Sequence, residues 1–289
     1  MPVASFGGLR VLSLESRRAQ EMAKLIANCG GQPTVAPSMR EVPLESNTEA
    51  LVFASSLMED RLDMVIFMTG VGTRALTRVV ETAYPLEKFV AALKRVAVVA
   101  RGPKPVAVLR EMQVPISLIV PEPNTWRELL QVLDAESETL PLAGRRVAVQ
   151  EYGESNLELL RGLARRGAAV TTVPVYQWMP AEDPAPLRAA AGALARGEID
   201  VILFTSSAQL RYLLQAAEEQ GIREQVVRAF DRVVVASIGP MMSEELKEHG
   251  IQVDMEPSHP KMGFLVQEAA QKSAEILEKK RAASKSRSF

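Results

Sequence analysis

The residues best suited to chemistry lie in two turns that each follow an apolar run and precede a helical pattern. One turn belongs to DMVIFMTGVGTRAL (residues 63–76) and the other to DVILFTSSAQLRYL (residues 200–213). Their residues are Thr69, Gly70, Val71 and Gly72 in the first turn, and Thr205, Ser206, Ser207 and Ala208 in the second. Backbone N–H groups at the start of a helix bind anions, and small side chains keep those groups accessible. Both turns therefore predict sites for an anionic ligand.

Two further turns have the same character. The run RVAVV (residues 95–99) leads into a turn that contains Arg101, Gly102 and Lys104. The run RVVV (residues 232–235) leads into a turn that contains Gly239, Pro240, Met241 and Met242. Ligands of open α/β sheets bind beyond the carboxyl ends of the strands, which is where all four turns are predicted. We expect two domains to hold one large anion between them, with Arg101 and Lys104 assisting.

A dinucleotide site is an alternative, because residues 70–75 fit G-x-G-x-x-A at a strand-to-helix turn. That pattern also requires an acidic residue about 20 positions later, at the end of the next strand. Here the next strand runs into Arg101, and the second turn contains no glycine. The G-x-x-x-x-G-K-[ST] motif is absent as well. The sequence therefore favours another kind of anion over a nucleotide.

Few side chains could serve as a catalytic group or metal ligand. The two histidines, His249 and His259, fall at a predicted helix end and in a predicted loop, where surface roles are expected. A single cysteine, Cys29, excludes an intrachain disulfide and a thiolate metal cluster. Tyr152 and Tyr176 are better candidates, because a phenol at a strand end can donate a proton or a hydrogen bond. A purely structural tyrosine is the equal alternative at both positions.

The elements that carry these turns form an internal duplication. Asp63 and Asp200 are 137 residues apart, and the same offset relates Gly30 to Gly167. Each half alternates about five apolar runs with helical patterns, which is typical of a parallel sheet covered by helices. The sequence therefore predicts an α/β protein with two flavodoxin-like domains, each having a parallel five-stranded sheet. The boundary between the copies is expected near residues 135–144.

The composition sets limits on location and partners. The 289 residues are 47% hydrophobic and 24% charged with a net charge of -1, which is typical of a soluble globular protein. Near-neutral charge provides no overall field for nucleic acid, and no apolar run approaches the roughly 20 residues of a membrane span. We expect a cytoplasmic protein that binds neither nucleic acid nor membrane. Residues 281–289 are expected to form a disordered basic tail.

Several segments together resemble one known family. These are TGVGTRAL, VAVVARGPK, GRRVAVQEYGESNLELLRGLARRGAAVTTVPVYQW, DVILFTSSA and ASIGP, in that order along the chain. Over about residues 9–270 the chain resembles uroporphyrinogen-III synthase. The resemblance implies a cyclising lyase that closes linear hydroxymethylbilane into uroporphyrinogen III, losing water and inverting the last pyrrole ring. It also implies a monomer that needs no cofactor or metal.

The resemblance further assigns domains and site residues. It implies one discontinuous domain of residues 1–37 plus 181–280 and a second of residues 48–173, joined by linker strands at 38–47 and 174–180. Tyr176 is the residue it assigns to catalysis, as the helper for departure of the hydroxyl. The substrate-binding set is Thr69, Gly70, Val71, Gly72, Arg101, Gly102, Lys104, Tyr152, Thr205, Ser206, Ser207, Ala208, Gly239, Pro240, Met241 and Met242.

Two positions depart from the family pattern. Met241 and Met242 stand where the family often has Thr-Thr, so hydroxyl contacts are lost there. Glu15 places a carboxylate where a cation is common, and Arg17 is a candidate to compensate. The alternative function is a non-catalytic two-domain protein that binds or senses a small molecule, because the same architecture can clamp a ligand without transforming it.

Overall fold

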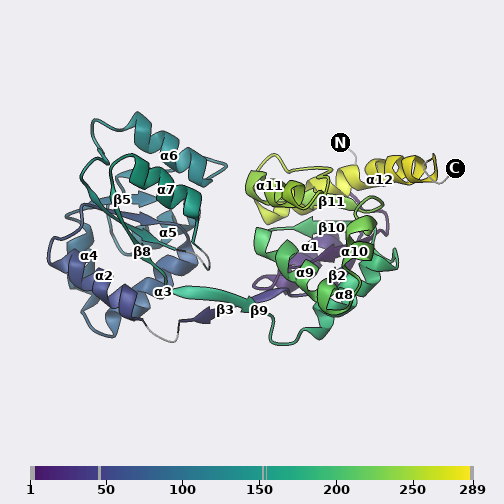
Figure 1. Cartoon of the computed structure of the whole chain (residues 1–289), viewed down its shortest axis with the longest axis horizontal. Coiled ribbons are helices and arrows are strands. Elements are labelled where there is room, and N and C mark those ends of the chain that lie inside the picture. Colours follow the sequence, from purple (N-terminus) through teal and green to yellow (C-terminus); the bar gives the residue numbers. More distant parts are fainter. Residues whose placement is uncertain (1–3, 45–46, 152, 154, 287–289) are drawn as a thin grey trace. The chain divides into compact units, whose positions relative to one another are not determined.

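A computed structural model describes residues 4–44, 47–151, 153 and 155–286, and it divides into two units (Figure 1). Unit 1 contains the chain up to Arg40 and again from Met179 onward, and unit 2 is Glu41–Trp178. Each unit is an α/β domain built around its own parallel sheet. The chain passes from unit 1 to unit 2 within β3 (Met39–Pro43) and returns within β9 (Tyr176–Pro180).

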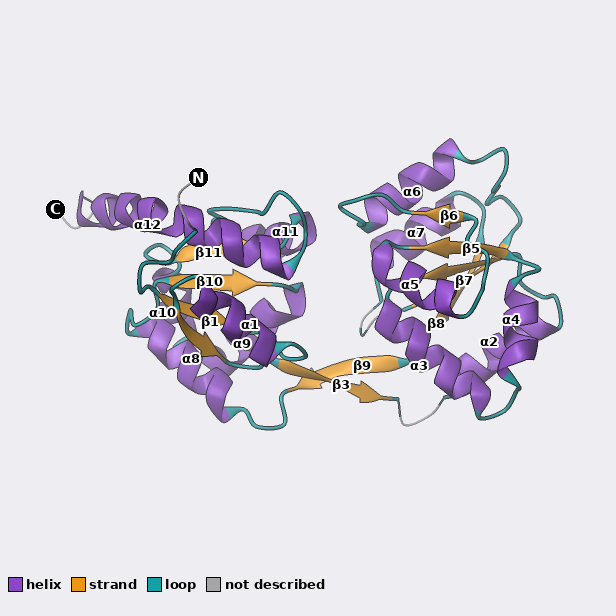
Figure 2. Cartoon of the chain, turned by 180° about the vertical axis from the view of Figure 1, so that it is seen from behind, coloured by secondary structure: helices purple, strands orange, loops and turns teal. Residues whose placement is uncertain are grey.

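Unit 1 has a parallel sheet in the order β11-β10-β1-β2. Alternate strand residues point to opposite faces, so Val11 and Leu203 belong to one core, while Leu12 and Phe204 belong to the other. Helices α1 and α12 cover the first face, and α8 to α11 cover the second (Figure 2). The elements are β1 Arg10–Ser13, α1 Ala19–Asn28, β2 Gln32–Val35, α8 Ala185–Ala195, β10 Val201–Phe204, α9 Ser207–Glu219, α10 Arg223–Ala229, β11 Val234–Ser237, α11 Pro240–Glu248 and α12 Met262–Ser286.

Unit 2 has a parallel sheet in the order β6-β5-β4-β7-β8. Helices α2 to α5 pack on one face, around Phe67 and Phe89, and α6 and α7 pack on the other, around Ile66 and Leu129. The elements are α2 Thr48–Met58, β4 Met64–Phe67, α3 Gly70–Glu81, α4 Leu86–Leu93, β5 Ala97–Ala100, α5 Pro103–Glu111, β6 Leu118–Ile119, α6 Trp126–Ala135, β7 Arg146–Gln150, α7 Leu157–Arg165 and β8 Ala169–Val173. Two further strands, β3 Met39–Pro43 and β9 Tyr176–Pro180, form a two-stranded sheet of their own.

The predicted fold class is confirmed, with a difference in unit 1. The fifth strand predicted for this sheet is reduced to a single bridge between Met255 and Ala236. The preceding residue, Asp254, accepts the Val235 N–H through its side-chain carboxylate at 2.7 Å. A side chain therefore satisfies the donor that a regular strand would satisfy with its backbone, and the strand pairing ends there.

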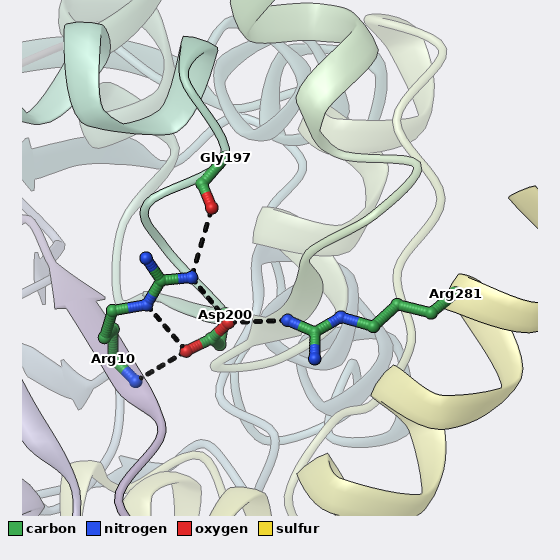
Figure 3. A network of polar contacts seen from close by, with 4 residues as sticks. All are labelled: Arg10, Gly197, Asp200 and Arg281. Atoms are coloured by element: carbon green, nitrogen blue, oxygen red, sulfur yellow. Dashed lines mark hydrogen bonds and ion pairs between the residues drawn. The ribbon is translucent and has the colours of Figure 1, made fainter.

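The two copies exchange two strands each, β1 with β2 and β7 with β8, and a matching ion pair lies at each of the two junctions. In unit 1, β1 of the first copy pairs with β10 of the second, and Arg10 forms a two-pronged contact with Asp200 at 2.9 Å (Figure 3). In unit 2, β7 of the second copy pairs with β4 of the first, and Arg146 contacts Asp63 in the same way. Hydrogen bonds from Arg146 lower the pKa of Asp63 to about 2. These contacts close the amino-terminal ends of the strands, opposite the candidate turns.

The prediction of a disordered tail is wrong for residues 281–286, where α12 continues to Ser286. Arg281 donates to the buried Asp200 carboxylate at 2.8 Å, beside Arg10 (Figure 3). Lys280 donates to Asp254 and to the backbone oxygen of Val233. Buried carboxylates thus give these cations specific partners that the sequence alone did not reveal. Residues 287–289 lie outside the described residues.

Within the described chain, no helix is both long and apolar enough to cross a membrane.

Candidate functional site

The first turn of unit 2 is a helix N-terminus at the carboxyl end of the central strand β4. Thr69 has extended backbone angles and its Oγ1 accepts the Gly72 N–H at 3.0 Å, as a threonine N-cap does. The Thr69 backbone oxygen accepts the N–H of Thr73 at 2.9 Å. In the described part of the chain, the N–H groups of Gly70 and Val71 receive no hydrogen-bond acceptor. Two backbone donors and the helix dipole are therefore available to an anion.

Packing explains both glycines of this turn. A Cβ atom on Gly70 would lie 2.7 Å from the backbone oxygen of Lys104, and one on Gly72 would overlap Nε2 of Gln150. Protein atoms therefore occupy the space that was expected to admit a ligand. The small size of Gly70 and Gly72 allows α3 to pack against α5 and β7, and only the backbone donors remain as binding groups.

Gln150, which sequence reasoning did not select, holds the turn from the neighbouring strand. It is fully buried at the end of β7, and its Oε1 accepts the Thr69 N–H at 3.4 Å. Its Nε2 donates to the backbone oxygen of Glu151. Glu151 is 8% exposed and carries a raised pKa, because burial disfavours its charged form. The available signal was that Gln150 and Glu151 end the apolar run RVAV with two polar residues.

The cationic turn of unit 2 follows β5. Arg101 is half-buried, and its Nε donates to the backbone oxygen of Met68 at 3.1 Å, which connects the β4 and β5 turns. Gly102 has φ 89°, in the left-handed region that favours glycine, and a Cβ there would lie 2.6 Å from the Asn124 side chain. Lys104 is exposed on the first turn of α5. This edge of the sheet thus brings Arg101 and the Thr69 turn together.

Tyr176, one of the two tyrosines predicted as candidates, is the first residue of β9. Tyr176 is 7% exposed and its ring belongs to the core beneath α2 to α5. Beside it, Gly153 bridges to Gln177, and a Cβ on Gly153 would lie 2.5 Å from the Trp178 ring. Gly153 therefore lies beside β9. Tyr152 lies outside the described residues.

In unit 1 the corresponding turn already has internal partners. The Thr205 N–H donates to Gln209 Oε1 at 2.8 Å, and the Thr205 hydroxyl donates to Glu15 Oε2 at 2.7 Å. Glu15 also accepts the Arg18 N–H at 3.2 Å, at the start of α1. Glu15, which departs from the family pattern, thus accepts the hydrogen bond of the Thr205 hydroxyl that was expected to bind a ligand. The backbone N–H groups that begin α9, at Ser206, Ser207 and Ala208, have no acceptor among the described residues.

The last predicted turn splits into an exposed and a buried part. Gly239 precedes Pro240, the first residue of α11, and its N–H donates to Ser237 Oγ at 3.3 Å. Met241 is 37% exposed, whereas Met242 is 2% exposed and packs in the core with Leu246. Met242 is therefore explained by packing, and Met241 is the methionine that solvent can reach.

The chain matches known proteins along most of its length. The family described as "Uroporphyrinogen-III synthase HemD" matches residues 20–267. A Methanothermobacter thermautotrophicus protein named "Putative uroporphyrinogen-III synthase" is 30% identical over 237 residues, which cover 81% of this chain and 87% of that protein. An uncharacterized Bacillus subtilis protein, YjjA, is 29% identical over 269 residues, covering 91% of this chain and 95% of its own.

Among solved structures, a mutant uroporphyrinogen III synthase of the extremely thermophilic bacterium Thermus thermophilus superimposes with a TM-score of 0.69 at 24% sequence identity. The superposition covers 94% of this chain and 100% of the Thermus chain. That likeness supports the fold described above.

Proposed function

The chain belongs to the uroporphyrinogen-III synthase family, and we propose that it cyclises hydroxymethylbilane to uroporphyrinogen III in tetrapyrrole biosynthesis. The observation that carries the proposal is the family match over residues 20–267, because that range includes all four candidate turns. The fold shared with the Thermus structure is consistent with the same assignment.

In the proposed reaction, the main task of the protein is to orient the substrate. The hydroxymethyl group of the substrate loses its hydroxyl as water. As the hydroxyl departs, the electron pair of the adjacent pyrrole nitrogen moves into the ring, a double bond forms to the methylene carbon, and that carbon becomes electrophilic. Attack on that carbon by the substituted position of the last pyrrole ring gives a spiro intermediate, and rearrangement inverts that ring. Closure at the unsubstituted position gives the uninverted isomer instead. Bound geometry and fixed dipoles can favour one closure over the other without a metal or an organic cofactor.

The substrate carries acetate and propionate groups that suit the donors of each unit. In unit 2 we assign carboxylate binding to the N–H groups of Gly70 and Val71, with Arg101 and Lys104 beside them. In unit 1 we assign it to the first N–H groups of α9. A carboxylate at a helix N-terminus gains about 0.3–1 kcal/mol per contact at an exposed site. Several such contacts are needed to select one conformation of a flexible chain.

We assign Tyr176 to departure of the hydroxyl, as the family resemblance implies. Tyr176 is 7% exposed, so little of this residue can reach a ligand. A buried phenol is oriented by its packing, which suits a proton or hydrogen-bond donor aimed at one oxygen atom.

The decisive experiment supplies purified protein with hydroxymethylbilane and separates the isomers after oxidation to porphyrins. The proposal requires isomer III to form faster than isomer I forms in a protein-free control. If only isomer I appears, at the protein-free rate, the synthase assignment is wrong. Binding of the tetrapyrrole without any change in isomer ratio would instead indicate the non-catalytic alternative.

We also propose that the protein acts in the cytoplasm as a monomer. Light scattering coupled to gel filtration checks the second statement, and a mass of twice 31.6 kDa would contradict it.

A further inference from the structure

A pocket of about 780 Å³ opens in unit 1 at the end of the sheet opposite the candidate turns. Its wall combines the segments that lead into β10 and β11 with the carboxyl-terminal part of α12. Both strands begin at this end, so their carboxyl ends, which carry the Thr205 and Gly239 turns, lie at the other end of the sheet. Pockets for small molecules measure roughly 300–1,000 Å³, so this one is large enough to hold a ligand.

The charged side chains of the wall are mainly cations, and two of them make two or more internal hydrogen bonds. Among the described residues the cations are Arg196, Arg228, Arg232, Lys280 and Arg281, and the acid is Asp231. Arg196 donates through Nε and Nη2 to Glu198, both at 2.8 Å. Lys280 donates to Asp254 and to two backbone oxygens. These two cations are therefore accounted for by the fold.

The other three arginines retain donors that the described chain does not use. Arg281 donates through Nη2 to Asp200 at 2.8 Å, and its Nε and Nη1 have no acceptor among the described residues (Figure 3). The Nη1 atom of Arg228 lies 3.6 Å from Glu224 Oε2, which is too far for a hydrogen bond. Arg232 is exposed, and its side chain makes neither a hydrogen bond nor an ion pair within the described chain. A guanidinium presents a planar fork of N–H donors that fits the oxygens of phosphate or carboxylate.

The internal duplication shows which partner Arg232 lacks. Arg95 precedes β5 as Arg232 precedes β11, and the two arginines are 137 positions apart, the offset of the duplication. In unit 2 the Nε of Arg95 donates to Asp60 at 2.7 Å. The position equivalent to Asp60 is Gly197; both have a left-handed φ, 55° and 73°, and the backbone oxygen of each accepts an arginine Nη2 at 3.1 Å. Unit 1 therefore retains the arginine but has no carboxylate in the place of its partner.

Packing does not explain the missing side chain at Gly197. A Cβ there meets no atom within 4 Å, and Asp60 carries a full side chain in the same backbone conformation. The second copy also has Arg228 where the first copy has an alanine, which adds a cation to the wall. In the opposite sense, Asp231 stands where the first copy has a lysine, and its carboxylate opposes an anion. The wall thus gains one arginine and frees another, against one added acid.

We propose that this pocket binds a small polyanion, a molecule with two or more phosphate or carboxylate groups, through Arg228, Arg232 and Arg281. The three guanidinium groups come from α10, from the segment before β11 and from α12, so a ligand with several anionic groups can meet more than one of them. A concave wall that carries charges of one sign concentrates their field and attracts counter-ions. Because the pocket lies at the opposite end of the sheet from the donors assigned to the substrate, the proposal does not depend on the proposed function.

Isothermal titration calorimetry tests the site with two probes that share this chemistry, pyrophosphate and citrate. At least one probe should bind saturably to the full chain at about 0.1 M salt, where long-range attraction between exposed charges is largely screened. Binding of either probe supports the site, and the tighter one identifies phosphate or carboxylate as the preferred group. Saturable binding of neither probe would overturn the proposal.

Gly197→Asp locates the site, because it places in unit 1 the partner that Asp60 gives Arg95. The new carboxylate should engage Arg232 and weaken binding of the tighter probe by roughly 10-fold or more, on the scale of a charge-assisted hydrogen bond. Gly197→Asn is the matched control, since asparagine has nearly the same shape and also tolerates a positive φ but carries no charge. It should bind the probe about as well as the wild type. Equal affinity of the Asp and Asn variants would overturn this pocket as the site.

Substitutions at exposed side chains test the same wall without changing a glycine. Arg232→Ala should weaken binding by roughly 10-fold, and Asp231→Asn should strengthen it, because the wall loses its acid. Arg223→Ala is the matched control, since Arg223 is an exposed residue of α10 outside the wall and the substitution removes the same charge. Its affinity should stay close to that of the wild type. An equal loss in Arg223→Ala and Arg232→Ala would show a response to net charge alone and would overturn a specific site.

Discussion

Replacing Gly72 by alanine isolates the contact that holds the first candidate turn. The new methyl carbon would overlap Gln150 Nε2 and would lie 2.6 Å from its Cδ. Alanine is intrinsically favoured over glycine in a helix by roughly 1 kcal/mol. That gain is exceeded by overpacking, about 1–3 kcal/mol, and by leaving the buried Gln150 amide and the Thr69 N–H without partners, about 1–3 kcal/mol. We expect a net loss of about 1–5 kcal/mol in the free energy of unfolding.

Urea denaturation of Gly72→Ala measures this loss, and Gly263→Ala is the matched control. Gly263 lies in the first turn of α12, and a Cβ there meets no atom within 4 Å. The control should therefore keep or raise stability. In the double variant Gly72→Ala with Gln150→Ala the methyl group has room, so the two losses should be less than additive by at least about 1 kcal/mol. Additive losses, or a Gly72→Ala variant as stable as the wild type, would refute the packing account of this turn.

Three further outcomes are expected. Tyr176→Phe should slow formation of isomer III by one to two orders of magnitude, roughly 1.4–2.7 kcal/mol of barrier, while circular dichroism shows a folded protein; unchanged turnover would make this residue structural. Gly70→Val should lower the melting temperature by several degrees, because its Cβ meets the Lys104 backbone at 2.7 Å, and a wild-type melting curve would contradict the contact. Asp63→Asn should cost about 1 kcal/mol at pH 7, since solvent screens the pair with Arg146. Because folding lowers the Asp63 pKa to about 2, the stability contributed by its pair with Arg146 is present above pH 3.8 and is lost as pH falls towards 2. The cost of Asp63→Asn should therefore be smaller at about pH 2.5 than at pH 7, and an equal cost at the two pH values would contradict this account.

The turns show how far local sequence reasoning reaches. Thr69 was placed correctly at a strand-to-helix turn, because an apolar β-branched run followed by a cap and a helical pattern is a local signal. The ligand-access role given to Gly72 did not follow, since the atom that fills its space belongs to Gln150, 78 positions away along the chain. A glycine required for packing and a glycine required for binding look the same in a sequence.

The acids show the same limit. Glu15 was identified as a departure from the family pattern, but its acceptance of the Thr205 hydroxyl joins residues 190 positions apart. Nothing in the sequence marks Glu151 as unusual, because a glutamate after a strand is usually exposed to solvent. Glu151 is instead buried beside β8 with no cation as a partner among the described residues, and burial raises its pKa. Burial depends on how the sheet packs, which the local sequence does not show.

By itself the sequence determined the α/β class, the alternation of strands and helices, and the duplication that places equivalent turns at equivalent strand ends. These features are written in local periodicity and in an offset between similar segments, so they survive without knowledge of any long-range contact. Only the tertiary structure decided how Gln150 supports Thr69, how Asp200 orders the segment at Arg281, and how Glu151 is left buried with one oxygen unpartnered among the described residues. The physical reason is that each depends on which side chain from a distant part of the chain removes water from a polar group or supplies its hydrogen bond.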